Sequence, residues 1–197
     1  MRKNRFRTFL LWALLTLACW AGALAVFLGN RQGNQEFTGY YDSPVLTGKE
    51  MELFIGEREE EDLPLTVAWK EREKENFSGN TGLTCQGNLL EISGEMKTLF
   101  SKQLIRGNFP WKGDTQGCVI SRGLSRELFG TDNGTGNEIR ARGETYTVRG
   151  ILEGEDNLLA VWAGEEEELE NFRLFYDADL VPVSQADEFL YQMTGTQ

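Results

Sequence analysis

The residues best suited to acid–base chemistry are the acids of Glu165–Glu168 together with Glu170. Two neighbouring carboxylates can act as general acid and base when a partly buried cleft raises the pKa of one of them. Acids packed this densely in the sequence are more typical of a solvated loop or the start of a helix. We therefore expect a solvent-facing cluster, with contact to a basic partner as the functional alternative.

A second set of oxygen-bearing side chains runs from Asp132 to Glu138 and resembles a calcium loop in composition. Calcium loops of the EF-hand type need ligands at fixed positions and a glutamate at the twelfth. This segment has neither the spacing nor the final glutamate. We expect its glycines and asparagines to form turns, and we expect no metal site.

The rest of the composition excludes several kinds of catalysis. The chain has no histidine, which excludes Ser-His-Asp and Cys-His mechanisms and histidine-ligated zinc. Cys85 and Cys118 either form a disulfide in an oxidising compartment or serve as two small buried apolar residues. The sequence leaves both readings of the cysteines open. We expect no catalytic residue and no bound cofactor, so the chain is not expected to be an enzyme.

An aromatic pair, Phe109 and Trp111, flanks Pro110. Exposed aromatic residues mark contact sites, whereas buried ones belong to the core. A core role is the favoured expectation for this pair.

The elements that would position these residues begin with an apolar N-terminal segment. Residues 2–7 include four cations, and Phe9–Leu28 then runs for 20 residues with Thr16 as its one ordinary polar side chain. Twenty helical residues match a hydrocarbon core of about 30 Å. Only Arg31 follows closely, so the charge asymmetry predicts a cytoplasmic N-terminus and an extracytoplasmic C-terminal part at the cell membrane.

Two other interpretations compete for this apolar segment. Cleavage of a signal peptide at Ala21–Ala23 or Ala23–Ala25 is disfavoured because the apolar run continues to Leu28. A lipoprotein anchored at Cys19 is disfavoured because apolar rather than polar sequence follows it. An uncleaved single-pass anchor is therefore expected, with the lipid bilayer as its first partner.

The charge of the chain excludes one class of ligand. There are 31 acids against 20 bases, and no acid precedes Glu36. Without the N-terminal cations the remainder carries about −15, which repels phosphate backbones. Nucleic-acid binding is therefore not expected.

Three segments divide the chain. Residues 1–29 form the basic tip and membrane helix, residues 30–39 lie in a polar stalk spanning Gly29–Gly39, and residues 40–197 form the exterior domain. Within that domain, alternation predicts a strand at Glu50–Ile55, and the run from Leu89 to Ile92 predicts a strand that ends at Gly94. Further expected elements are a strand or helix at Leu65–Trp69, a loop at Asn76–Gly82, a strand at Phe172–Tyr176 and a helix at Gln185–Met193 capped by Ser184.

The segment Gly117–Leu152 carries clearer local signals. Cys118–Ile120 is suited to a buried strand, and Ser121 can cap a following helix that ends at Gly130. Leu124, Leu128 and Phe129 lie on one face of that helix. Strands at Glu138–Arg142 and Thr145–Leu152 flank Gly143-Glu144, which predicts a hairpin with a type II′ turn.

These motifs, in order, resemble the MacB-like periplasmic core domain of ABC-transporter permeases. The resemblance rests on Leu104–Phe109, Gly113-Asp114, Cys118–Ser121, Leu124–Gly130 and Glu144–Leu152. One departure is that Arg106 precedes Gly107, where the family pattern has the arginine after the glycine. Gly107, Gly130 and Gly150 match family glycines, and their implied role is backbone geometry.

The resemblance implies an architecture and a function. The family has one membrane helix, this domain and then three further membrane helices, so Met1–Gln197 would correspond to the first helix and the exterior domain. No P-loop motif is present. A bacterial source, which the family implies, would make the glycosylation sequons at Asn76 and Asn133 coincidental.

The expected fold class is α+β: a single transmembrane helix followed by a compact mixed α/β extracytoplasmic domain with βαβ-type lobes. The expected function is non-catalytic, in export or mechanotransmission with ABC ATPase and permease subunits. A stand-alone cell-surface binding or sensor module is the principal alternative. A secreted hydrolase and a decayed gene product are further alternatives that the residues disfavour.

Overall fold

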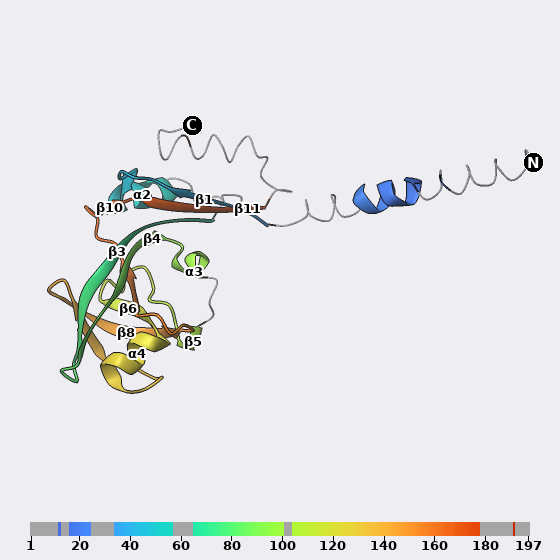
Figure 1. Cartoon of the computed structure of the whole chain (residues 1–197). Coiled ribbons are helices and arrows are strands. Elements are labelled where there is room, and N and C mark those ends of the chain that lie inside the picture. The colour runs from blue at the N-terminus through green and yellow to red at the C-terminus, as the bar shows by residue number, and fades with distance from the viewer. Residues whose placement is uncertain are drawn as a thin grey trace, which may run out of the picture.

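The structure is a computed structural model of the 197-residue chain and describes residues 12, 16–24, 34–56, 65–100, 104–177 and 191 (Figure 1). Residues 16–24 are helical, and no helix within the described ranges is both long and apolar enough to cross a membrane. Half of the expected membrane span Phe9–Leu28, and all of the expected helix Gln185–Met193 except Tyr191, lie outside the described residues, so both stay predictions.

A mixed sheet dominates the described residues, in the strand order β1-β11-β3-β4-β9-β6-β8-β5, and β7 pairs with both β3 and β8. Its strands are β1 (Asn34–Tyr40), β3 (Leu65–Gly79), β4 (Thr84–Gly94), β5 (Leu104–Gly107), β6 (Gly117–Ser121), β7 (Glu138–Ala141), β8 (Glu144–Leu152), β9 (Leu158–Trp162) and β11 (Asn171–Asp177). A small second sheet joins β2 (Leu46–Thr47) to β10 (Glu168–Leu169), and the helices are α2 (Gly48–Gly56), α3 (Met96–Leu99) and α4 (Arg122–Phe129).

The long strand β3 takes part in two lobes. β4 pairs along one edge of β3, whereas the other edge pairs first with β11, at residues 65–69, and then with β7, at residues 77–79. The strands β3, β4, β9, β6, β8 and β7 therefore pair in a closed ring, which we call the barrel lobe. The first part of β3 joins β1, β11 and α2 in a second unit, the terminal lobe, at the top of Figure 1.

A β-bulge marks the joint between the lobes. The register of β3 against β4 shifts between Arg72 and Glu75, and Lys74 has a φ of 59°. A bulge bends its strand and increases the local twist. The bend therefore falls between the part of β3 that pairs with β11 and the part that pairs with β7.

Each lobe has its own buried cluster. Phe77, Leu89, Ile120 and Leu128 belong to the cluster of the barrel lobe, against which α4 packs. The terminal lobe buries Met51 of α2 among residues of β3 and β11. A third cluster packs Trp69 and Ile92, from the shared strands β3 and β4, against the first residue of α3 and against residues of β6, β8 and β9.

The helix α4 confirms the signals of the sequence. The Ser121 hydroxyl accepts a hydrogen bond from the Leu124 amide at 3.2 Å, and Gly130 ends the helix with a φ of 67°. The same Ser121 oxygen accepts from the Leu158 amide at 3.1 Å and donates to the Asp156 carbonyl. With α4 between them, β6 and β8 are parallel, as expected of a βαβ-type unit.

Replacing Ser121 with alanine is expected to lower the free energy of unfolding by about 1–2 kcal/mol, because two amide groups lose their acceptor. Urea unfolding followed by circular dichroism measures the change. Ser78→Ala is the matched control, since Ser78 is half-buried and makes no side-chain hydrogen bond among the described residues. Equal losses in the two variants would contradict a capping role.

The strand expected at Glu50–Ile55 is wrong, because this segment lies in the helix α2. Thr47 and Glu50 form a capping box: the Thr47 amide donates to the Glu50 carboxylate at 2.7 Å, and the Glu50 amide donates to the Thr47 hydroxyl at 3.2 Å. Met51 is buried, whereas Leu53 is 55% exposed. The apolar alternation is therefore accidental.

Two boundary predictions also need correction. Residues 34–39 of the expected stalk belong to β1, which pairs antiparallel with β11. The loop expected at Asn76–Gly82 is shorter, since β3 continues to Gly79.

The hairpin between β7 and β8 is confirmed, but its turn is not of type II′. Arg142 and Gly143 are the two central residues and have φ values of 51° and 86°. Two positive φ values define a type I′ turn. The strands at Leu89–Gly94, Cys118–Ile120 and Phe172–Tyr176 are confirmed, and Leu65–Trp69 is a strand.

Candidate functional site

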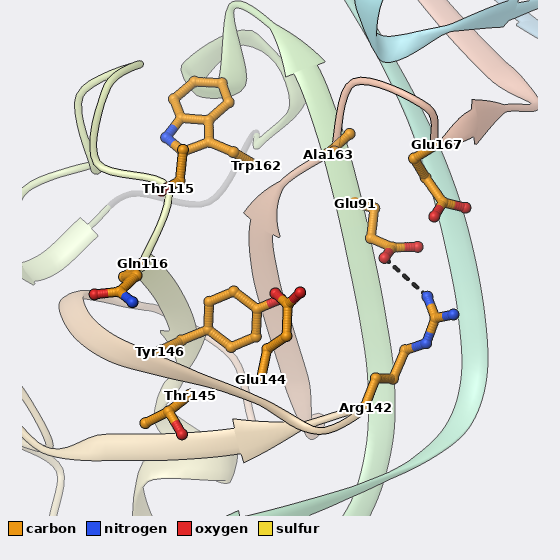
Figure 2. A pocket seen from close by; sticks show the side chains of 11 residues that line it. Glu91, Thr115, Gln116, Arg142, Glu144, Thr145, Tyr146, Trp162, Ala163 and Glu167 are labelled. Atoms are coloured by element: carbon orange, nitrogen blue, oxygen red, sulfur yellow. Dashed lines mark hydrogen bonds and ion pairs between the residues drawn. The ribbon is translucent and has the colours of Figure 1, made fainter.

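A pocket of about 690 Å³ lies where the two lobes meet, and we take it as the candidate site (Figure 2). Its walls come from the middle of β4, the chain just before β6, the β7–β8 hairpin and the connection from β9 to β10. The lining residues are Glu91, Thr115, Gln116, Arg142, Glu144, Thr145, Tyr146, Trp162, Ala163, Gly164 and Glu167.

One side of the pocket is an ion-pair network, the crease network, made of Arg72, Glu91, Arg142 and Glu167. The Glu91 side chain is only 12% exposed and accepts from Arg72 Nε at 2.6 Å and from Arg142 Nη1 at 3.0 Å. Arg72 also reaches Glu167. The network thus joins β3, β4, the β7–β8 turn and the chain before β10.

The charge states of the crease network follow from these contacts. Burial disfavours a charged Arg72, but the hydrogen bonds and charges of Glu91 and Glu167 outweigh it and raise the pKa of the Arg72 guanidinium. Arg72 therefore stays charged at any physiological pH. The Glu91 carboxylate accepts hydrogen bonds from two guanidinium groups, those of Arg72 and Arg142.

The acidic cluster expected to face solvent is divided by the structure. Glu167 and Glu170 each lie 3.4 Å from Lys70 Nζ, so both are ion-paired. The backbone carbonyls of Glu165 and Glu167 accept from the first amides of α2. Solvent exposure is confirmed for Glu165, Glu166 and Glu168, whereas Glu167 belongs to the pocket.

Two aromatic side chains form another part of the wall, and hydrogen bonds hold both. The Tyr146 hydroxyl donates to the Glu144 carboxylate at 2.8 Å, and Trp162 Nε1 donates to the Trp111 carbonyl at 3.1 Å. Burial, with the hydrogen bond to Glu144 and its charge, raises the pKa of Tyr146 well above its ordinary value. Tyr146 therefore stays a neutral donor.

This arrangement is suited to binding rather than to bond chemistry. The one hydroxyl of the pocket that is hydrogen-bonded to a carboxylate, Tyr146 on Glu144, is kept neutral by burial and by that carboxylate, and the Glu91 carboxylate is occupied by two arginines. Within the described ranges, no three acids or cysteines are grouped so as to hold a metal ion. The absence of enzymatic activity stays a prediction.

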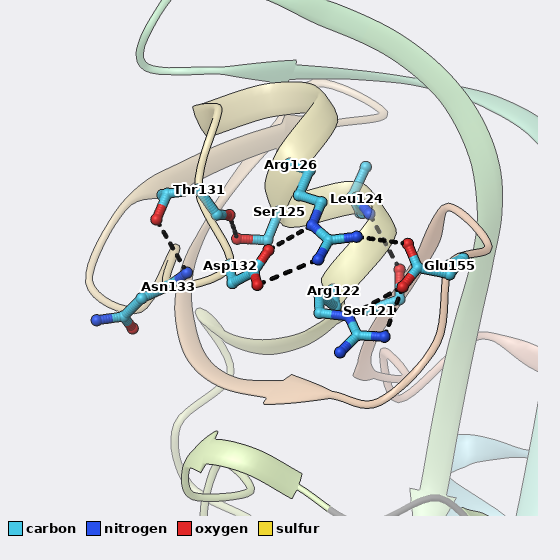
Figure 3. A network of polar contacts seen from close by, with 9 residues as sticks. All are labelled: Ser121, Arg122, Leu124, Ser125, Arg126, Thr131, Asp132, Asn133 and Glu155. Carbon is cyan, nitrogen blue, oxygen red and sulfur yellow. Dashed lines mark hydrogen bonds and ion pairs between the residues drawn. The ribbon is translucent and has the colours of Figure 1, made fainter.

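The oxygen-rich segment Asp132–Glu138 forms turns held by its own side chains and by α4 (Figure 3). Arg126 takes both carboxylate oxygens of Asp132, and these hydrogen bonds lower the pKa of that carboxyl group. The Thr135 hydroxyl donates to the Asn133 side chain at 2.8 Å. Arg126 also donates to Glu155 at 2.8 Å, so the segment is tied to the connection between β8 and β9.

The two exterior cysteines are free thiols in the barrel lobe. Cys118 is fully buried, and Cys85 is half-buried against the same cluster. Burial, with a smaller contribution from the charge of Glu127, raises the pKa of Cys85 to about 11. Burial raises the pKa of Cys118 as well.

These two thiols are expected to react slowly in the folded chain, because the thiolate is the reactive form. We expect Cys19→Ser protein to show no fast thiol toward iodoacetamide at pH 8, and two after unfolding in guanidinium without reductant. The pKa of the Cys85 thiol is near 9 in the unfolded chain and about 11 in the folded chain. The stability that comes from keeping this thiol protonated and buried is therefore present below pH 9 and is lost as the pH rises through 11. If neither thiol reacted after unfolding, Cys85 and Cys118 would be joined in a disulfide instead.

The aromatic pair does not share one environment, and the core expectation is wrong for Trp111. Trp111 is 72% exposed, whereas Phe109 is half-buried and stacks on Phe100 with ring centroids 6.0 Å apart. The family-matching glycines serve backbone geometry as expected: Gly107 has a φ of 71°, and a Cβ on Gly150 would lie 2.7 Å from the Asn108 carbonyl.

Most of the pocket is not evident from the sequence. Of the crease network, only Glu167 stands out there, as a member of the acidic cluster. The sequence carries one signal for the crease network. Glu91 interrupts the apolar run Leu89–Ile92, and a carboxylate that is buried in such a strand requires a cationic partner.

The ring closure and the two lobes define a class of mixed α/β domain. That fold is shared with the periplasmic region of MacB from Actinobacillus actinomycetemcomitans, at a TM-score of 0.66 and 11% identity over 85% of this chain and 87% of that one. The extracellular domain of the ABC-type transporter YknZ from Gram-positive bacteria matches at 0.61 and 16% identity, over 84% and 96% of the two chains.

A domain assigned to a permease protein of Porphyromonas gingivalis matches at a TM-score of 0.54 and 16% identity, over 84% of both chains. No protein-family model and no curated protein matches the sequence. The TM-scores and the shared lengths establish that the described domain has the MacB-like periplasmic fold, which the resemblance of the sequence motifs predicted.

Proposed function

We propose that the chain is a membrane-anchored, extracytoplasmic component of an ABC-type permease system and acts without catalysis of its own. The observation that carries this proposal is the fold, shared with the exterior domains of MacB and YknZ over most of both chains. Its partners would be an ABC ATPase and further permease subunits, and its role would be export or mechanotransmission.

The joint between the lobes supports a mechanical role. A relay needs two packed bodies and a defined connection between them. Here the β3–β4 pair passes through both lobes and bends at the bulge after Arg72. The crease network crosses that joint by ion pairs with one or both partners largely shielded from water.

Membrane anchoring through Phe9–Leu28 is the part of the proposal that is simplest to test. We expect the full chain to stay with the membrane fraction after carbonate extraction. The double substitution Leu14→Arg/Leu17→Arg adds about 2.5–3.5 kcal/mol per charge at the centre of a span. We expect it to release the protein, and unchanged membrane retention would contradict the span.

The partner is tested by purifying the tagged full chain from its native membranes in mild detergent after cross-linking. We expect a P-loop ATPase and a multi-span permease to co-purify, and the isolated complex to hydrolyse ATP. The double-arginine chain is the control and should capture neither. Isolation of the chain alone, with no ATPase activity, would favour the alternative.

That alternative, a stand-alone binding or sensor module, is favoured by one observation. The pocket between the lobes has a size typical of sites for small ligands and holds fixed aromatic and charged side chains. Such a module would bind its ligand with full affinity in the absence of any ATPase.

A further inference from the structure

Among the pocket carboxylates, Glu144 differs from the others in its partners. Glu91 is paired with two arginines, and Glu167 with Arg72 and Lys70. Glu144 accepts a hydrogen bond from the neutral Tyr146 hydroxyl, and no cation among the described residues is paired with it. The pocket therefore presents one carboxylate whose charge is not neutralised within the described domain.

Two aromatic rings of the pocket, that of Tyr146 beside this carboxylate and that of Trp162 on another side, are held in place before any ligand arrives. Tyr146 is fixed by Glu144, and Trp162 is fixed through its indole N–H by the Trp111 carbonyl. Figure 2 shows the two rings on different sides of the pocket, with Glu144 beside the Tyr146 hydroxyl. The face of an aromatic ring attracts a cation, most strongly when the ring and the charge are shielded from water.

The electric field favours the same sign of ligand. The lining includes three glutamates and one arginine, and the described domain belongs to a chain with a net charge of −11. The negative charge of the whole protein favours the approach of cations over anions. Within the pocket, Arg72, Arg142 and Lys70 neutralise Glu91 and Glu167, which leaves Glu144 as the source of negative potential at the hairpin.

We propose that the pocket binds an organic cation, a primary ammonium or a guanidinium, with its charge on Glu144 and its carbon stem against Tyr146 and Trp162. The volume of about 690 Å³ is sufficient for a ligand of amino-acid size or larger. The same chemistry is available from a free aliphatic amine and from a lysine or arginine side chain of a partner polypeptide. This proposal does not depend on the transport function.

Isothermal titration of the full chain in detergent tests the proposal with three probes. Cadaverine represents a free amine, acetyl-Gly-Lys-Gly-amide represents a side chain, and acetyl-Gly-norleucine-Gly-amide lacks the charge. We expect saturable binding of cadaverine or of the lysine peptide, and none of the norleucine peptide. Tighter binding of cadaverine identifies a small amine, and tighter binding of the lysine peptide identifies a polypeptide side chain.

The substitution Glu144→Gln is expected to weaken that binding about tenfold or more, because the charge-assisted hydrogen bond is lost. Glu138→Gln is the matched control, since Glu138 is also exposed and lies on the same hairpin but does not line the pocket. Equal affinity of the Glu144→Gln and wild-type chains, binding of the norleucine peptide, or no binding of either amine would overturn the proposal. None of these outcomes depends on whether an ATPase partner is found.

Discussion

Replacing Gly94 with alanine is expected to lower the free energy of unfolding by about 3–4 kcal/mol, because two costs add. Gly94 has a φ of 97°, a conformation that strains any residue with a Cβ. An added Cβ would also lie 2.3 Å from the Thr66 carbonyl of β3 and 2.9 Å from the end of Met51 in α2. Relieving that contact requires moving the backbone of a central strand.

Gly82→Ala separates the two costs. Gly82 has a similar φ of 84°, but a Cβ there meets no atom within 4 Å. We expect it to lose only about 1 kcal/mol, from the backbone conformation. Urea unfolding followed by tryptophan fluorescence gives both values, and equal losses at the two positions would refute the role assigned to the close approach at Gly94.

Removing Arg72 from the crease network by Arg72→Met is expected to cost about 2–3 kcal/mol of unfolding free energy. The substitution keeps most of the apolar stem but leaves Glu91 and Glu167 with fewer partners while both stay largely shielded. Loss of one member of a buried ion pair costs about 3–5 kcal/mol, and partial exposure of these groups reduces that figure. Thermal unfolding at pH 7 measures the change.

Two controls make this prediction specific. Arg122→Met breaks the pair with Glu155, whose side chain is 61% exposed, and is expected to cost less than about 1 kcal/mol. The double variant Arg72→Met/Glu91→Leu removes the stranded carboxylate and is expected to recover part of the loss. A loss for Arg72→Met no larger than that for Arg122→Met would show that the crease network does not hold the lobes together.

Local signals predicted the barrel lobe better than the terminal lobe. Ser121 and Gly130 determine both ends of α4 within one short segment, so that helix could be located from sequence. In α2 two signals competed: Met51, Leu53 and Ile55 alternate, whereas Thr47 and Glu50 have capping-box spacing. The capping box decided the outcome because it satisfies backbone amides that alternation leaves unpaired.

The pocket lay beyond sequence reasoning because tertiary pairing assembles it. Arg72, Glu91, Arg142 and Glu167 come from segments that are far apart in the chain. They meet only because β3 changes its partner from β11 to β7 at the bulge. A glycine at the bulge would have indicated it in the sequence, but the residue with the positive φ is Lys74.

The pairing of β1 with β11 has a consequence for how the chain acquires its structure. These strands are the first and last of the described domain, so β1 has to wait for nearly the whole domain to emerge before it can pair. Closing so long a loop carries an entropic cost that is recovered late, and chains with distant pairings fold slowly. If the part that follows the anchor crosses the membrane as it is synthesised, the barrel lobe can form during translocation, whereas the terminal lobe is completed only after β11 has emerged.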